Sequence, residues 1–342
     1  MRMVPVSELR VNSELAIDIV DEEHKVLLTK GHILNQINVD RLQATNIASV
    51  YITDKFCYNN TPTYTSQPTN VLRKVVTIRN AIHNAAKGIE ANESIAKALK
   101  AVNEIVSELD RQKYSLRIGY EPKKISLKDF DERTIYIAMM SSLLSLKIGF
   151  VKQQTYLVCL GALIKDIAVI SPTFKGQIDE KNKFHPIKGY SYMKEHYNFP
   201  EPVLQIILQH HELYDGKGYP YGLKGEEICP GARIIAIIEL YYKIKTTHME
   251  EGGSNLEQEF NKWASHLDPK YLDVFLKHAN LFEPDMLVQL NNGDIAVVTS
   301  SPTNNPFKPR VKILRSETYQ EGTILNLGDT RLAVYRVVYY VD

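Results

Sequence analysis

The long central stretch of the chain, residues 126–280, constrains the fold more than any other feature of the sequence. Its pattern is mostly helical, and one loop-rich interruption at 214–231 divides it. A helical stretch of this length predicts an α-helical domain of ordinary size. Segments with a strand-like pattern lie on both sides of it, so we expect a mainly α protein with β-rich flanks.

The N-terminal flank, residues 1–56, predicts a small β-rich module. Short apolar stretches such as Leu15–Val20 and Val26–Leu28 are separated by polar turns, and Ile47–Thr53 alternates as a strand does. Asn38–Thr45 has the pattern of a short helix. The following polar residues, 57–69, contain two prolines and no periodicity, which is typical of a linker.

Residues 70–125 predict a helical connector. Apolar residues recur at helical spacing up to residue 112, and Asn92-Glu93-Ser94 resembles the start of a second helix. Two interpretations stay open: the helical pair packs on the main core, or it forms a homodimer.

The C-terminal flank, residues 281–342, predicts a β-rich domain. Asn291-Asn292-Gly293 has the composition of a hairpin turn between two of its strand-like runs. The runs are Leu287–Leu290, Asp294–Ser300, Arg310–Leu314 and Tyr335–Val341.

Charge and cysteine usage restrict the class of protein. The chain has 41 Lys and Arg against 40 Asp and Glu, for a formal charge of +1, which argues against a dedicated DNA-binding or polybasic membrane-binding protein. Three widely spaced cysteines give no disulfide framework, as in a reducing compartment. We find no apolar run of membrane-spanning length and no secretory signal, and therefore expect a cytoplasmic protein without a membrane span.

Three short segments of the central stretch carry residues suited to chemistry. The pair Lys165-Asp166 interrupts an apolar helix, His185 precedes a proline, and His210-His211 precedes a glutamate. Imidazoles with a carboxylate suit Zn, Mn or Fe. Adjacent helical residues point about 100° apart, so binding of one ion by both His210 and His211 needs a helix end or another element. The alternative is a plain surface or hydrogen-bonded pair.

A fourth segment, Asp215–Pro220 (DGKGYP), predicts a turn, since its glycines permit positive φ and its proline fixes the exit. The whole run HHELYDGKGYPYGLKGEEICPGARIIAI resembles the signature of the HD-GYP family, bacterial phosphodiesterases of cyclic di-GMP within the HD superfamily. The resemblance covers roughly residues 126–280. It implies an all-helical HD-type domain between the N-terminal β module and the C-terminal β-rich domain, with two or three iron or manganese ions bound by His and Asp.

Carried over residue by residue, the resemblance implies one complete and one dismantled metal site. The complete set is Asp166, His185, His210 and His211. In the other set, the family's HD histidine falls on Lys165, and an earlier histidine falls near Arg133. The last metal-binding aspartate falls on Glu239, which is a possible further ligand. We therefore expect one divalent ion (Fe, Mn or Zn) and the loss of the second metal site. Glu212 is a candidate for orienting the ligands.

The residues that bind phosphate in the family are also changed. A lysine after the HD pair falls on Val169, and an Arg-rich stretch after the last aspartate is replaced by residues 243–248. Lys165 has two interpretations: its ammonium offsets the repulsion of Asp166 and Glu239 without a metal, or it reaches solvent and does nothing.

These changes predict a degenerate HD-GYP protein, a pseudoenzyme that acts by binding. Its partners would be cyclic di-GMP, GGDEF-type proteins or other signalling proteins. The binding residues expected around the GYP loop are Asp215, Gly216, Lys217, Gly218, Tyr219, Pro220 and Arg233. One alternative is a phosphodiesterase with an atypical mononuclear site, with Asp166 and Lys165 as its catalytic residues. A second is a structural adaptor that binds neither metal nor nucleotide.

Overall fold

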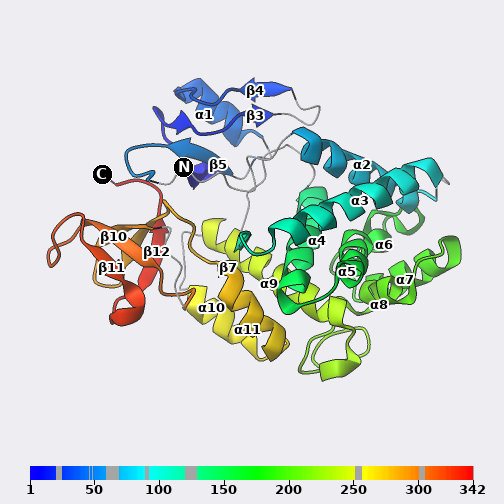
Figure 1. Ribbon diagram of the computed structural model, residues 1–342. Helices are drawn as coiled ribbons and strands as arrows, with labels where there is room; N and C mark the ends of the chain where they lie inside the picture. Colours follow the sequence, from blue (N-terminus) through cyan, green and yellow to red (C-terminus); the bar gives the residue numbers. More distant parts are fainter. Residues whose placement is uncertain are drawn as a thin grey trace.

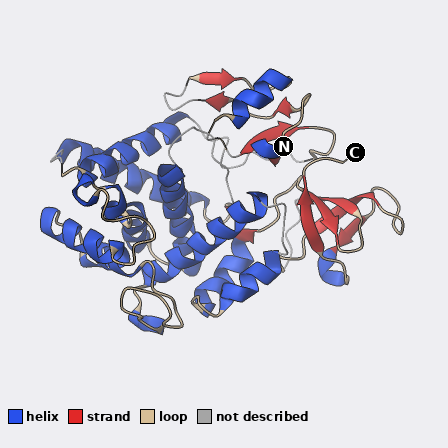
Figure 2. Cartoon of the chain, turned by 180° about the vertical axis from the view of Figure 1, so that it is seen from behind, coloured by secondary structure: helices blue, strands red, loops and turns tan. Residues whose placement is uncertain are grey.

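The computed structural model describes residues 1–20, 25–45, 47, 49–58, 69–88, 92–119, 129–250, 256–299 and 305–341. A large helical region is flanked by a small N-terminal β module and a C-terminal β-sheet (Figures 1 and 2). Both termini lie on the side of the two β units in both views. The mainly α fold class expected from the sequence is confirmed.

The N-terminal module is built around a short antiparallel sheet. Its strand order is β1-β5-β2, and a second pair, β3 and β4, lies beside it. The helix predicted at Asn38–Thr45 begins two residues earlier, because Asn35 caps it by accepting from the Asn38 backbone N–H at 2.9 Å. The bounds are β1 Arg2–Pro5, β2 Glu14–Leu15, β3 Ile19–Val20, β4 Val26–Leu28, α1 Gln36–Gln43 and β5 Ser49–Thr53.

The helical region holds one continuous hydrophobic core, which runs from Ile78 to Leu281. Its helices are α2 Thr69–Ala86, α3 Asn92–Gln112, α4 Asp129–Ile148, α5 Lys152–Ile164, α6 Ile167–Ile170, α7 His185–His196, α8 Glu201–Gln209, α9 Pro230–Glu250, α10 Leu256–Ala264 and α11 Pro269–His278. A parallel pair of short strands, β6 Ile118–Gly119 and β7 Ala279–Asn280, joins the segment after α3 to the end of this region.

The connector helices α2 and α3 belong to the same core. Val102 and Leu109 are buried in it. The end of α2 is tied to the rest of the region, because its Ala85 and Ala86 carbonyls accept hydrogen bonds from Tyr192 Oη and Ser171 Oγ at 2.8 and 2.7 Å. This packing favours the first interpretation of the helical pair. Most of the expected linker 57–69 lies outside the described residues.

One helical segment, Lys152–Ile170, is long and apolar enough to cross a membrane by length and composition, with a mean hydropathy of 1.3. The expectation that the sequence holds no such run is therefore wrong. The interior of the protein buries 67% of the segment, as it does for a core helix. Gly161 lets α5 approach α8 closely, since a Cβ there would lie 2.7 Å from the Ile206 side chain.

The C-terminal sheet is antiparallel in the order β11-β10-β9-β8-β12. Its strands are β8 Leu287–Leu290, β9 Ile295–Val298, β10 Arg310–Arg315, β11 Ile324–Asn326 and β12 Val334–Val338. The predicted hairpin turn is confirmed, with Gly293 at a φ of +92°. The last predicted strand ends early: Tyr339 and Tyr340 pack against the N-terminal core, and Tyr340 Oη lies 2.9 Å from Ser13 Oγ.

Arg233, expected near the binding loop, instead stabilises the helical domain. Its Nη1 lies 2.7 Å from Asp268 Oδ2, and its guanidinium lies over the Tyr271 ring. Asp268 also caps α11 by accepting from the Lys270 and Tyr271 backbone N–H groups.

We expect Asp268→Ala to lower the free energy of unfolding by about 3 kcal/mol, because it removes a helix cap and leaves a buried guanidinium unpaired. The matched control is Asp273→Ala on the same helix, which removes an exposed pair with Lys277 and should cost less than about 0.5 kcal/mol. Denaturant unfolding of both variants measures the difference. Equal losses would contradict a structural role for the Arg233–Asp268 pair.

Candidate metal centre

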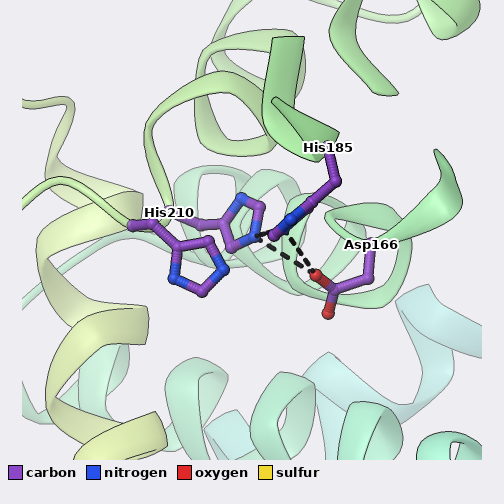
Figure 3. Close-up of side chains that lie close together, drawn as sticks. Asp166, His185 and His210 are labelled. Carbon is purple, nitrogen blue, oxygen red and sulfur yellow. Dashed lines mark hydrogen bonds and ion pairs between the residues drawn. The ribbon is translucent and has the colours of Figure 1, made fainter. Parts of the chain in front are cut away.

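Three separate elements bring the expected ligands together at helix ends. Asp166 lies in the turn between α5 and α6, and His185 is the first residue of α7. His210 caps the end of α8, and His211 follows it outside the helix. The helix end removes the directional problem of two adjacent helical histidines. Figure 3 shows His185 and His210 turned toward Asp166.

The ligand atoms lie close together. Asp166 Oδ1 is 3.2 Å from His210 Nε2 and 3.4 Å from His185 Nε2, and the two Nε2 atoms are 3.1 Å apart. One possible ligand atom from each of the four residues, His211 included, lies within 4.8 Å of the others. Asp166, His185 and His210 are buried.

The backbone sets the protonation of two histidines. His185 Nδ1 donates to the Asn182 carbonyl and His210 Nδ1 donates to the Ile207 carbonyl, both at 2.8 Å. A carbonyl oxygen only accepts, so the proton is on Nδ1, and in the neutral ring the Nε2 atom carries a lone pair. Two lone pairs and a carboxylate oxygen then face one another, an arrangement that a bound cation would stabilise.

A divalent metal ion fits this donor set. Two ligand atoms that each lie about 2.0–2.2 Å from an ion, in tetrahedral or octahedral geometry, are about 3.0–3.5 Å from one another. The distances among Asp166 Oδ1 and the two Nε2 atoms fall in this range. His211 is neutral, because its burial and the nearby His210 and Lys165 lower its pKa far below the ordinary value. Three imidazoles and one carboxylate suit Zn, Mn or Fe.

Lys165 does not reach solvent. Its side chain is 2% exposed, and its Nζ contacts Asp166 Oδ2 and lies 2.6 Å from Glu239 Oε1. Burial alone would lower the pKa of Lys165, but the two carboxylates outweigh burial and raise it, so the amine is charged. Burial would likewise raise the pKa of Asp166, and the ammonium holds it well below its ordinary value. Of the two interpretations of Lys165, the structure supports the charge-compensating one.

A cavity of about 330 Å³ opens beside this ion pair. Arg133 lies in its wall from α4, with its Nη1 3.0 Å from Glu180 Oε2. Arg133, near which the resemblance implies an earlier histidine of the family, therefore lies in the wall of this cavity. Sequence reasoning missed Glu180, whose segment carries no motif.

The GYP loop folds back onto the centre. The Tyr219 ring stacks on His211 with centroids 4.7 Å apart, and the Tyr219 N–H donates to the His211 carbonyl at 3.1 Å. Gly218 permits this approach, because a Cβ there would lie 2.3 Å from the Leu213 nitrogen. Burial, with Glu239 and Asp166 nearby, raises the pKa of Tyr219 to about 12. Tyr219 thus supports a candidate ligand.

Glu212 binds the backbone of the GYP loop and does not bind a histidine of the cluster. Its buried carboxylate accepts from the Tyr221 and Leu223 backbone N–H groups at 2.7 and 3.0 Å. The expectation that it orients the ligands directly is therefore wrong. Asp215 is tied to α10–α11 by His266 Nδ1 at 2.7 Å and to the exposed Lys217.

Comparison with known proteins agrees with this architecture. Residues 180–273 match the family model of the HD domain, and residues 287–334 match that of a KOW domain associated with the HD domain. Over 150 residues the chain is 30% identical to the cyclic di-GMP phosphodiesterase PA4108 of Pseudomonas aeruginosa, and over 156 residues it is 31% identical to the cyclic di-GMP phosphodiesterase response regulator RpfG of Xanthomonas campestris.

These alignments cover 42% of this chain in both cases, but only 36% and 40% of the two relatives. A solved structure, the HDG"Y"P protein Bd1817 of Bdellovibrio bacteriovorus, aligns with a TM-score of 0.46 at 18% identity and covers 80% of this chain and 97% of that one. The sequence comparisons show an HD domain related to those of cyclic di-GMP phosphodiesterases.

We expect the purified protein to bind at most one transition-metal ion per chain, measured by elemental analysis. The double variant His210→Ala/His211→Ala should lose the ion, because it removes two of four ligands. The matched control is His196→Ala on α7, whose ring bonds the Tyr192 carbonyl away from the cluster. Two tightly bound ions, or an unchanged content in the double variant, would contradict the assignment.

Proposed function

We propose that this chain, whose HD domain is related to those of cyclic di-GMP phosphodiesterases, is a degenerate HD-GYP signalling protein that binds the nucleotide and hydrolyses it little or not at all. The relatives are cyclic di-GMP phosphodiesterases, which supports cyclic di-GMP as the ligand. A cytoplasmic location is part of the proposal.

One observation carries the proposal: the Lys165 ammonium lies between the Asp166 and Glu239 carboxylates. The resemblance places the second metal of the family there. An ammonium compensates the two negative charges, but it provides no open coordination position for a water or a phosphate oxygen. A bound ion at the four-residue cluster would supply Lewis-acid chemistry, whereas hydrolysis by two metals needs both the attacking and the leaving oxygen to be held.

Further substitutions at the expected phosphate-binding positions also disfavour hydrolysis. Val169 brings an apolar side chain to the position of a lysine expected at the phosphate. In the segment that replaces the Arg-rich stretch, Lys243 lines the cavity, but Lys245 is buried and donates to the Leu281 carbonyl at 2.9 Å. Loss of one donor to a developing negative charge costs about 10²–10³ in rate. The remaining cations, Arg133 and Lys243, suit binding of a phosphate group.

Contact with a protein partner is a second candidate function, which the surface of the GYP loop favours. Tyr219 is half-buried against His211, so it is a poor anchor for a partner. Tyr221 is 60% exposed, and Lys217 of the same loop is exposed. Exposed aromatic rings and cations are typical of binding surfaces.

We expect the metal-loaded protein to hydrolyse cyclic di-GMP at least about 10³-fold more slowly than an intact relative, because several phosphate-stabilising groups are replaced. Product formation by chromatography measures the rate, and binding is measured separately by calorimetry. Asp166→Asn is the control for contaminating activity. Robust turnover that Asp166→Asn abolishes would support the mononuclear phosphodiesterase instead.

We expect Tyr221→Ala and Lys217→Glu each to weaken capture of a GGDEF-type protein by about 1–3 kcal/mol, because both remove exposed contacts of the loop. Their melting temperatures should equal that of the wild type. Capture that survives both changes would remove the loop from consideration as a protein-binding surface.

A further inference from the structure

One face of α9 forms a long wall of the cavity beside Lys165. Glu239 lies at the Lys165 end, Tyr242 and Lys243 follow one turn later, and Thr246 and Thr247 follow in the next turn. Eight residues of α-helix span about 12 Å. The cavity is therefore long enough for a phosphate with an attached sugar or base, and its walls offer hydroxyl groups and cations along that length.

The cavity is small for a cyclic dinucleotide. Its volume of about 330 Å³ lies at the lower end of the range of about 300–1,000 Å³ usual for small-ligand pockets. A molecule with two purine bases, two sugars and two phosphates would extend beyond it. The part that extends must lie against the rim.

The chain's one tryptophan contacts a residue that lines the cavity. Trp263 on α10 is 37% exposed, and Lys243 Nζ lies 5.5 Å from its ring centroid. Lys243 also lines the cavity. The indole is thus one side chain away from the cavity, beyond Lys243. Trp263 also contacts His266, whose Nδ1 bonds Asp215 of the GYP loop.

We propose that Trp263 and Lys243 form an outer subsite that stacks one purine base of a cyclic dinucleotide while the other half of the molecule occupies the cavity. This inference rests on nucleotide binding, the proposed function. An exposed indole stacks on any base, and such a contact strengthens binding by about 5- to 150-fold per base. Lys243 is exposed and carries its charge on a flexible stem, so it can turn from the indole to a phosphate. The alternative is that Trp263 only packs beside Lys243.

Because Trp263 is the one tryptophan, its intrinsic fluorescence reports on the subsite. We expect titration with cyclic di-GMP to quench or shift this emission, with the same midpoint as calorimetry. Trp263→Leu should weaken binding by about 10-fold, and Trp263→Phe should retain most of the affinity, since a phenyl ring still stacks. Tyr335→Leu, which removes an exposed aromatic ring from the C-terminal sheet, is the matched control and should have no effect.

Ribose 5-phosphate, which has no base, separates stacking from general damage. Its affinity should be the same for the wild type and Trp263→Leu. One outcome would overturn the subsite alone: calorimetry shows that cyclic di-GMP binds, but the tryptophan emission is unchanged and Trp263→Leu binds as tightly as the wild type. The proposed function would then stand without the subsite. If calorimetry shows no binding of cyclic di-GMP to the wild type, nucleotide binding and the subsite are both wrong.

Discussion

The ion pair of Lys165 with Asp166 and Glu239 is the interaction on which the rest of the site depends. A fully buried ammonium is costly unless it is paired, and two carboxylates brought together repel one another unless a cation separates them. The three groups therefore require one another. Since Asp166 precedes α6 and Glu239 lies on α9, the pair also fixes the turn that presents Asp166 Oδ1 to the histidines.

The two oxygens of Asp166 divide the site into two halves. Oδ2 faces the ammonium, whereas Oδ1 faces His185 and His210, whose tautomers are set by backbone carbonyls. One half is thus neutralised by the protein itself, and the other presents lone pairs suited to a metal. The GYP loop supports the second half, because Glu212 binds the loop backbone and Tyr219 stacks on His211. In this arrangement the loop is first a structural part of the site, and its exposed residues are available to a partner.

Local pattern predicted the elements better than their contacts. Helical and strand periodicity located α2, α3, β5 and the β8–β9 hairpin, because these signals depend on neighbours in the sequence. The ligand set came from a long family motif rather than from spacing. That Glu212 binds the loop backbone depends on how the loop folds. Whether Lys165 turns inward depends on Glu239, which lies far from it in the chain. The early end of the last strand has the same cause, since Tyr340 meets Ser13 across the molecule.

Trp263 and Glu180 were missed for a related reason: neither belongs to a motif, and only the fold brings them near Lys243 and Arg133.

The central claim, that an ammonium replaces one metal and leaves room for another, is tested most directly by an anomalous difference map from a crystal of the protein grown with Mn²⁺. The account predicts one peak, among Asp166, His185 and His210, and none between Asp166 and Glu239. Two peaks about 3.5–4 Å apart, with Lys165 turned out of the site, would contradict it.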